Sequence, residues 1–357
     1  MPVSLISSVL KHAAAAVLTC GALAILGANT ASAFNFYQDL FVNLSARPLS
    51  LGGAFAALSG PEAAFHNPAG LAAVRRLTFL HNHSARHFPG STEGGMSEWD
   101  QLDGDTQCIA VPLPLATYAH GFTFSGEMGY DYRGHPADGS LGYPREQYWG
   151  TENIDAVATG TGLPLAAGVA LRRHLGRFTP AEADPADAPA WIRLGEGTSW
   201  GVVGRVWPSL DLGYSEQKLD FDWTVLAPGD NRNSQLAEMT SRLKQERQGW
   251  AFQPLGWLTF AADSVEEHFL TDDTDWVGVL HGGTASRMRH HRGGEMQLGP
   301  WAKYRWGDFN GHGTVGAALN ICGIWLNYSE VQDLLPEIVG SGQNFADIHI
   351  YGFEWAW

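Results

Sequence analysis

The sequence has 357 residues and a formal net charge of −15, from 22 basic and 37 acidic side chains. An acidic chain lacks the basic surface that nucleic acids require, so we exclude a nucleic-acid partner. The length allows two soluble domains or one large barrel. A mean hydropathy of −0.14 with 14 Trp, 17 Phe, 10 Tyr and 43 Gly fits a membrane β-barrel or a secreted β-sandwich.

The first 33 residues predict a secretory signal peptide. Lys11 and His12 precede an apolar run from Ala13 to Leu26, and Ala31-Ser32-Ala33 matches a cleavage site. The run is too short for a membrane helix, and no later segment has 18 consecutive apolar residues. A lipoprotein would use Cys20, but Thr19 is unfavourable before such a cysteine. Two cysteines follow the signal and could pair in an oxidising periplasm, although two give no framework: Cys108 and Cys322.

The next distinctive stretch runs from Ser45 to Ala73 and is rich in small residues. Gly52-Gly53 allows a close backbone approach or a positive φ. Asn67-Pro68-Ala69-Gly70 predicts a turn, because proline fixes φ and asparagine can bond its own backbone. Three large apolar side chains in this stretch need a surface to pack on: Phe55, Leu58 and Phe65.

These motifs resemble the N-terminal signature of the long-chain fatty acid transporter (FadL-type) superfamily and its PorV-type relatives. The resemblance implies an all-β fold: a transmembrane antiparallel β-barrel of the outer membrane formed by residues 75–357. Residues 34–74 would form a hatch inside its lumen. Asn67, Pro68 and Ala69 would then hold the hatch, and Phe55 and Phe65 would contact substrate or barrel wall. The alternative is that this segment is purely a structural plug.

Alternating hydrophobicity indicates strands with one lipid-facing and one lumen-facing side. It is clear over Tyr118–Tyr130, and we expect Glu295–Trp306 and Thr314–Trp325 each to form one further strand. Aromatic residues near the strand ends, including Trp306 and Trp325, favour interfacial girdles. Charged side chains on the lumen side are expected to form a paired network: Glu295, Lys303, Arg305 and Glu354.

The C-terminal segment alternates aromatic residues with small or polar ones and ends in Trp357. Such a strand resembles the signal read by the barrel-assembly machinery, which we expect as a partner. We place thirteen strands along the chain, and a barrel with both ends at the periplasm needs an even number. We therefore predict fourteen, with the missing one between Leu270 and Gly311, and twelve as the alternative.

The remaining polar clusters carry weaker signals. His81, His83 and His87 alternate along one strand, but Phe79 shares their face and indicates lipid, so we predict no metal there. We interpret Asp272, Asp273 and Asp275 as a solvated loop, because the EF-hand glycine and glutamate are missing. His290-His291 among arginines is interpreted as a basic loop or turn that could meet lipopolysaccharide phosphates.

No catalytic, phosphate-binding or haem motif is present, so we predict neither a cofactor nor an enzyme, with activity at the barrel rim as the weakest alternative. The resemblance implies uptake of a hydrophobic small molecule, a long-chain fatty acid or aromatic hydrocarbon, across the bacterial outer membrane. The chain would contact membrane lipid and lipopolysaccharide. The main alternative is a PorV-type shuttle or scaffold with a secreted protein partner, which the entry from Arg47 to Gly53 and the proline-marked hairpins favour.

Overall fold

A computed structural model describes residues 45–87, 101–130, 144–160, 162–179, 190–226, 235–271, 285–331 and 348–357. Three short helices come first: α2 (Ala46–Ser50), α3 (Ala63–His66) and the 3-10 helix η2 (Pro68–Ala73). The strands then follow in chain order: β1 (Thr78–His87), β2 (Gln101–Pro112), β3 (Ala116–Tyr130), β4 (Pro144–Thr159), β5 (Leu165–Thr179), β6 (Ala190–Trp207), β7 (Leu210–Leu226), β8 (Gln235–Leu255), β9 (Leu258–Thr271), β10 (Ala285–Leu298), β11 (Ala302–Phe309), β12 (His312–Ile321), β13 (Ile324–Val331) and β14 (Ile348–Ala356).

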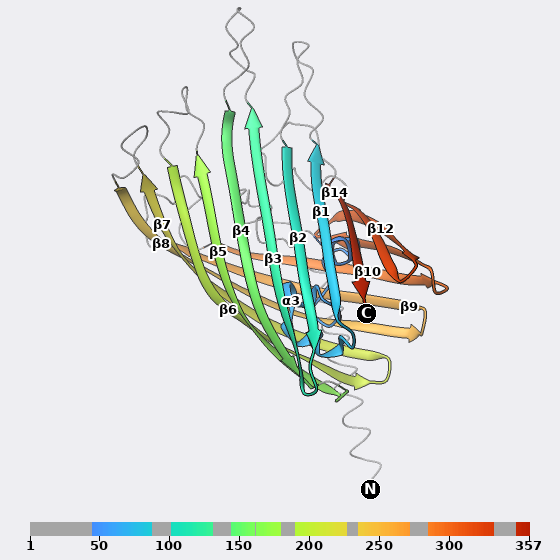
Figure 1. Cartoon of the computed structure of the whole chain (residues 1–357). Coiled ribbons are helices and arrows are strands. Elements are labelled where there is room, and N and C mark those ends of the chain that lie inside the picture. The colour runs from blue at the N-terminus through green and yellow to red at the C-terminus, as the bar shows by residue number, and fades with distance from the viewer. Residues whose placement is uncertain are drawn as a thin grey trace, which may run out of the picture. The chain divides into compact units, whose positions relative to one another are not determined.

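The fourteen strands form one closed antiparallel barrel, in which each strand pairs with its sequence neighbours and β1 pairs with β14 (Figure 1). Phe79 of β1 lies opposite Trp355 of β14, so the C-terminal strand closes the ring. Closure removes the free edge that an open sheet would present to lipid. The predicted all-β barrel and the number fourteen are confirmed. The predicted place of the missing strand, between Leu270 and Gly311, is wrong, because the strand that the sequence count merged with its neighbour is β13.

Two predicted strands were wrong in extent. Glu295–Trp306 is divided between β10 and β11 by a turn in which Gly299 has a φ of 74°. Thr314–Trp325 is divided by a two-residue turn at Cys322-Gly323, where both φ angles are positive. Such a turn matches the twist of the flanking strands. Its two residues put Trp325 on the lumen side, over the ammonium of Lys303, and outside the predicted lipid girdle.

The outer face of the barrel carries the expected apolar band. On β12 the outward set Val315, Ala317, Leu319 and Ile321 alternates with inward Thr314, Gly316 and Ala318. Large aromatic side chains are exposed at the turn end of the wall, as expected for an interfacial girdle: Trp207, Trp257, Trp301, Trp355 and Trp357. This band and the closed fold place the chain in the outer membrane. No helix among the described residues is long and apolar enough to span a membrane.

Ser45–Val74, which we call the inner segment, lies inside the ring of strands. Its α2 contacts β11, β12, β13 and β14, whereas η2 contacts β3, β4, β5 and β6. A segment that touches opposite sides of a closed wall must occupy the lumen. Its apolar side chains are almost fully buried, with Phe55 at 0% and Leu71 at 0% exposure. They form a core with small inward residues of the wall, such as Ala110, Ala119 and Ala156.

Inward-facing glycines let the wall approach this segment closely. A Cβ on Gly121 would lie 2.8 Å from the ring of Phe65, and one on Gly168 would lie 2.5 Å from the backbone of Pro68. Real Cβ atoms do not come this near to backbone, so the wall is shaped to the segment. Seven glycines on seven described strands contact it in this way: Gly121, Gly168, Gly201, Gly213, Gly293, Gly307 and Gly316.

The structure also bears on the interpretations of the histidine pair and of the two cysteines, and it leaves the aspartate cluster and the signal peptide untested. His290 and His291 lie in β10, not in a loop, with His291 buried in the lumen. Cys108 faces the lumen and Cys322 is exposed at a turn, so the two do not pair. Asp272, Asp273, Asp275 and residues 1–44 lie outside the described residues, and the signal peptide remains a prediction.

Candidate functional site

The strongest candidate for a functional site is the inner segment and the side chains of the wall that hold it. The tight start of the segment depends on Gly52 and Gly53, whose φ angles of 65° and 83° favour glycine. Gly53 donates its N–H to the carbonyl of Pro48 at 2.8 Å, which ends α2. The carbonyl of Gly52 then meets Nδ1 of His291 on β10 at 2.7 Å.

Asn67 joins the second turn of the segment to two strands of the wall. Its Oδ1 accepts from the N–H of Ala69 at 3.1 Å and caps η2, as expected for asparagine before a helical turn. The two N–H groups of its Nδ2 are shared among three carbonyls, of Ala56 at 2.6 Å, Val202 at 3.2 Å and Tyr214 at 3.3 Å. Pro68 and Ala69 pack against Gly168. The predicted holding residues therefore lie at one contact between segment and wall.

Asp263 on β9 makes a second contact. One carboxylate oxygen accepts from the backbone N–H groups of Phe55 at 2.8 Å and Ala56 at 3.0 Å. The same oxygen lies 3.0 Å from Nη1 of Arg247, which also donates to the carbonyl of Gly53 at 2.7 Å. Buried backbone groups need partners, and here charged side chains of the wall supply them. Other polar side chains of the wall donate hydrogen bonds to backbone carbonyls of the segment. Arg172 donates to the carbonyl of Phe65, Ser215 to that of His66 and Thr314 to that of Ser50.

The two phenylalanines predicted to touch substrate or wall both touch protein here. Phe55 packs 5.3 Å from the ring of His66 and 5.5 Å beneath the guanidinium of Arg47. Phe65 fits the space left by Gly121. Both side chains are nearly fully buried, so in this arrangement they hold the segment in place.

The predicted network of lumen charges reaches the inner segment through Arg47. Glu295 Oε2 lies 2.7 Å from Nε of Arg305 and 3.3 Å from Nε of Arg47, and Lys303 lies 3.9 Å from Oε1. Glu354, on β14, adds negative charge to this neighbourhood. Arg47 also donates to the carbonyl of Ser59 at 2.6 Å, so one cation connects segment and wall.

Two titratable groups of the segment are buried at unusual pKa values. Burial raises the pKa of Glu62 to about 7, and the nearby Arg47 only partly offsets this. Its Oε2 has no hydrogen-bond partner within the described residues. Burial also lowers the pKa of His66 well below its ordinary value, helped by Arg247 and Arg172. Closing the lumen thus favours neutral forms of both groups.

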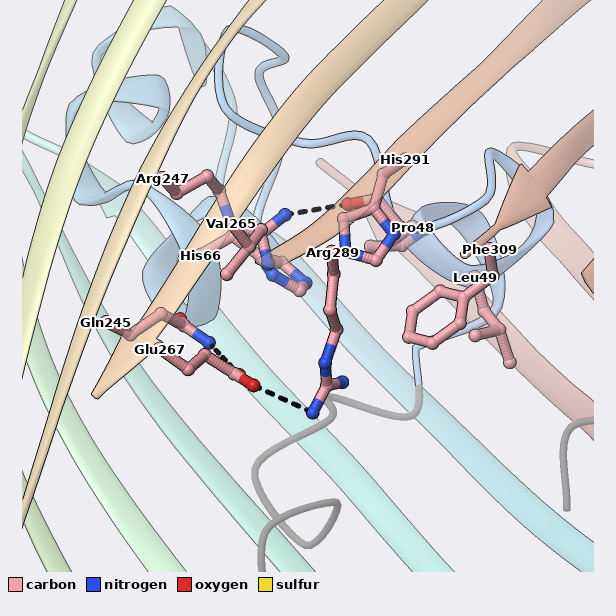
Figure 2. Close-up of a pocket in the computed structure, with 11 residues that line it drawn as sticks. Pro48, Leu49, His66, Gln245, Arg247, Val265, Glu267, Arg289, His291 and Phe309 are labelled. Atoms are coloured by element: carbon pink, nitrogen blue, oxygen red, sulfur yellow. Dashed lines mark hydrogen bonds and ion pairs between the residues drawn. The ribbon is translucent and has the colours of Figure 1, made fainter. Parts of the chain in front are cut away.

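A small cavity of about 30 Å³ lies between the segment and β8 to β11 (Figure 2). Its polar side is built by Glu267, which accepts from Gln245 at 2.8 Å and pairs with Arg289 at 2.9 Å. Pro48, Leu49 and Phe309 form its apolar side. Such a volume holds about two water molecules, and ligand pockets measure roughly 300–1,000 Å³. A hydrophobic ligand would need the segment to move.

The side chains that the structure describes do not form a metal-binding site. No group of three or more His, Cys, Asp or Glu among them has a metal-binding arrangement. His81 and His83 face outward with Phe79, as the sequence indicated, and His83 lies 3.1 Å from Asp105. The side chain of His87 lies outside the described set.

These features define the class: a fourteen-stranded outer-membrane β-barrel whose lumen holds an N-terminal segment. No family model and no curated protein matches the sequence. Among solved structures, the chain is similar to the toluene transporter TbuX of Ralstonia pickettii, with a TM-score of 0.60 at 12% identity over 88% of this chain and 98% of that one. For the toluene transporter TodX of Pseudomonas putida the TM-score is 0.58 and the identity 11%, over 88% of this chain and 99% of that one. For a FadL homologue of Pseudomonas aeruginosa the TM-score is 0.52 and the identity 13%, over 87% of this chain and 97% of that one. The chain has the fold of FadL-type transport barrels.

Sequence reasoning missed the residues that carry most of the contacts to the segment. Asp263 and Arg247 sit in β9 and β8 with no motif around them. Arg47 and Glu62 could have been found, because single charges in a stretch of small and apolar residues need buried partners. The inward glycines also gave a signal, since glycine at lumen positions of successive strands indicates a close neighbour inside the barrel.

Proposed function

We propose that this barrel is a passive channel for hydrophobic small molecules and that the inner segment is its hatch. The observation that carries the proposal is the inner segment itself, which occupies the lumen of a fold shared with aromatic-hydrocarbon and fatty-acid type channels. Hydrogen bonds join it to the wall at two places. Asp263 of the wall accepts from the backbone of Phe55 and Ala56, and Asn67 of the segment donates to the wall carbonyls of Val202 and Tyr214. Such contacts can be exchanged for water when the segment moves.

Hydrophobic molecules cross the lipopolysaccharide leaflet poorly, so a protein path increases their flux. Apolar burial would contribute roughly 0.8 kcal/mol per CH₂ to their binding. The apolar side of the lumen, built from alanines of β2 to β5 against Phe65 and Leu71, is the surface that a displaced segment would expose. We assign Phe55, Phe65, Asn67, Pro68 and Ala69 to the hatch. The charged network of the wall that contacts the hatch through Arg47 consists of Glu295, Lys303, Arg305 and Glu354. Neither a cofactor nor catalysis is part of the proposal.

A reversible disulfide between segment and wall tests this function. A Cβ on Gly316 would lie 2.5 Å from the Cβ of Ser50, so Ser50→Cys with Gly316→Cys joins α2 to β12 after a small adjustment. Uptake of radiolabelled toluene and of oleate is measured in cells that carry the chain, the double variant or an empty vector, in a Cys322→Ser background. We expect one of the two compounds to enter faster with the chain, and the oxidised double variant to block its uptake until reductant is added.

Each single cysteine variant is the matched control and should transport with and without reductant. Uptake no faster than with the empty vector for both compounds would contradict the channel. Uptake that is unchanged in the oxidised double variant would contradict the hatch. The solved structures reported above give no support to a PorV-type scaffold, which would instead require a bound secreted protein.

A further inference from the structure

His66 places a titratable ring at the contact between the inner segment and the wall. The residue ends α3, and its carbonyl accepts from the hydroxyl of Ser215 on β7 at 3.0 Å. Its ring lies 5.3 Å from that of Phe55 and lines the small cavity described above (Figure 2). Nε2 of the ring is buried and has no hydrogen-bond partner within the described residues. The surroundings of this ring therefore depend on where the segment lies.

The charged groups around the ring are already balanced by one another. Three ion pairs between adjacent strands lie there: Arg172 with Glu152 at 2.9 Å, Arg247 with Asp263 at 3.0 Å, and Arg289 with Glu267 at 2.9 Å. His291 of β10 also lines the cavity, whereas Glu62, at the start of α3, is influenced by Arg47 and Glu354. Each of the three carboxylates has an arginine, so an imidazolium at His66 would add a positive charge without an anion of its own.

A charged His66 does not suit the closed lumen. Burial, together with the positive charges of Arg247 and Arg172, holds the pKa of His66 well below its ordinary value. The cavity beside the ring has room for about two water molecules, too few to hydrate an imidazolium. We propose that His66 is a proton sensor whose protonation displaces the inner segment from the wall. This inference rests on the proposed hatch and names the signal that opens it.

The direction of the pH dependence follows from the two positions of the segment. With the segment displaced, His66 meets water and binds a proton at its ordinary pKa of 6.5, whereas the closed lumen admits the proton only at lower pH. Closure is therefore fully supported by His66 above pH 6.5 and weakens as the pH falls below that value. One pH unit lower, the displaced population should be about tenfold larger than for a side chain that cannot be protonated. Glu62 acts in the opposite direction, because closure favours its protonated form.

Labelling of Cys108 tests the sensor, because this thiol is buried against the carbonyl of Pro61 and becomes accessible when the segment moves away. The reagent is a dipyridyl disulfide, which stays reactive toward thiols in mild acid. Purified barrels with Cys322→Ser are labelled between about pH 7.5 and about pH 5.5, with and without His66→Gln. We expect the rate of the parent relative to His66→Gln to rise about tenfold over this range. The contribution of Glu62 is common to both chains and cancels in this ratio.

His290→Gln is the matched control. His290 precedes His291 on β10, but its ring faces outward, with Nδ1 3.1 Å from the hydroxyl of Ser264. This variant should follow the parent at every pH, and a loss of pH dependence equal to that of His66→Gln would overturn the inference. Heat-modifiable migration on gels shows whether each variant is folded. If His66→Gln does not fold, labelling of Cys108 relative to the exposed Cys322 in a Glu62→Gln chain should rise as the pH falls, and a flat ratio would overturn the sensor.

Labelling reports movement of the segment and uptake reports flux, so the sensor and the channel fail separately. A flat ratio of parent to His66→Gln, in a barrel whose uptake is blocked by the disulfide between positions 50 and 316, would overturn the sensor and leave the hatch. A ratio that rises in acid, in a barrel that takes up neither toluene nor oleate, would support the sensor and contradict the channel.

Discussion

Removing the carboxylate of Asp263 should release the inner segment from the wall. In Asp263→Ala, the N–H groups of Phe55 and Ala56 lose their acceptor and Arg247 loses its carboxylate partner. Hydrogen bonds to charged groups contribute about 1.5–3 kcal/mol each. Two such bonds at the lower value give about 3 kcal/mol, so the population with a displaced segment should rise about 100-fold.

The chain contains its own reporter for this displacement. Cys108 is 1% exposed, and its Sγ donates to the carbonyl of Pro61 in the inner segment at 3.4 Å. In a Cys322→Ser background, the rate of maleimide labelling at Cys108 therefore measures how often the segment moves away. We expect Asp263→Ala to label about 100-fold faster. Asp220→Ala, which removes an exposed aspartate from the outer face of β7, is the control and should label at the parent rate.

The result that would refute this reasoning is a folded Asp263→Ala barrel whose Cys108 labels at the parent rate. The polar contacts of β9 would then not hold the segment, and its retention would depend on apolar packing alone.

Three further expectations use the same labelling assay. Asn67→Ala removes the hydrogen bonds of Oδ1 and Nδ2 at the second turn and should speed labelling at least tenfold. An unchanged rate would show that packing of Pro68 suffices. Gly121→Val should displace Phe65 and speed labelling, whereas Gly256→Val, whose Cβ meets nothing within 4 Å, should leave the labelling rate unchanged. Equal rates for the two variants would contradict the close fit between Gly121 and Phe65. Because the pKa of Glu62 is raised from 4.5 to about 7 when buried, the closed state binds more protons than an open one in that window. Closure is then most stable below pH 4.5 and weakens as the pH rises to 7, so labelling relative to Glu62→Gln should increase over this range, and a flat ratio would contradict the burial of an uncharged Glu62.

The sequence by itself determined the barrel. Strict alternation puts apolar groups on lipid and small or polar groups in the lumen, and an aromatic C-terminal strand closes the ring at β1. This pattern is local and periodic, so it survives without tertiary information. Where the count of strands depended on turns of two or three residues, as at Gly299 and Cys322-Gly323, alternation continued through the turn and concealed it.

Only the tertiary structure decided which residues hold the inner segment. Asp263 lies 208 residues from Phe55, and Arg247 lies 194 from Gly53. Contacts between residues so distant depend on the register of every strand between them, and a one-residue slip would turn Asp263 outward to lipid. Within one strand, alternation predicted which side a residue faces, although beyond a concealed turn it placed Trp325 on the wrong side. The closed barrel decided what each residue meets there.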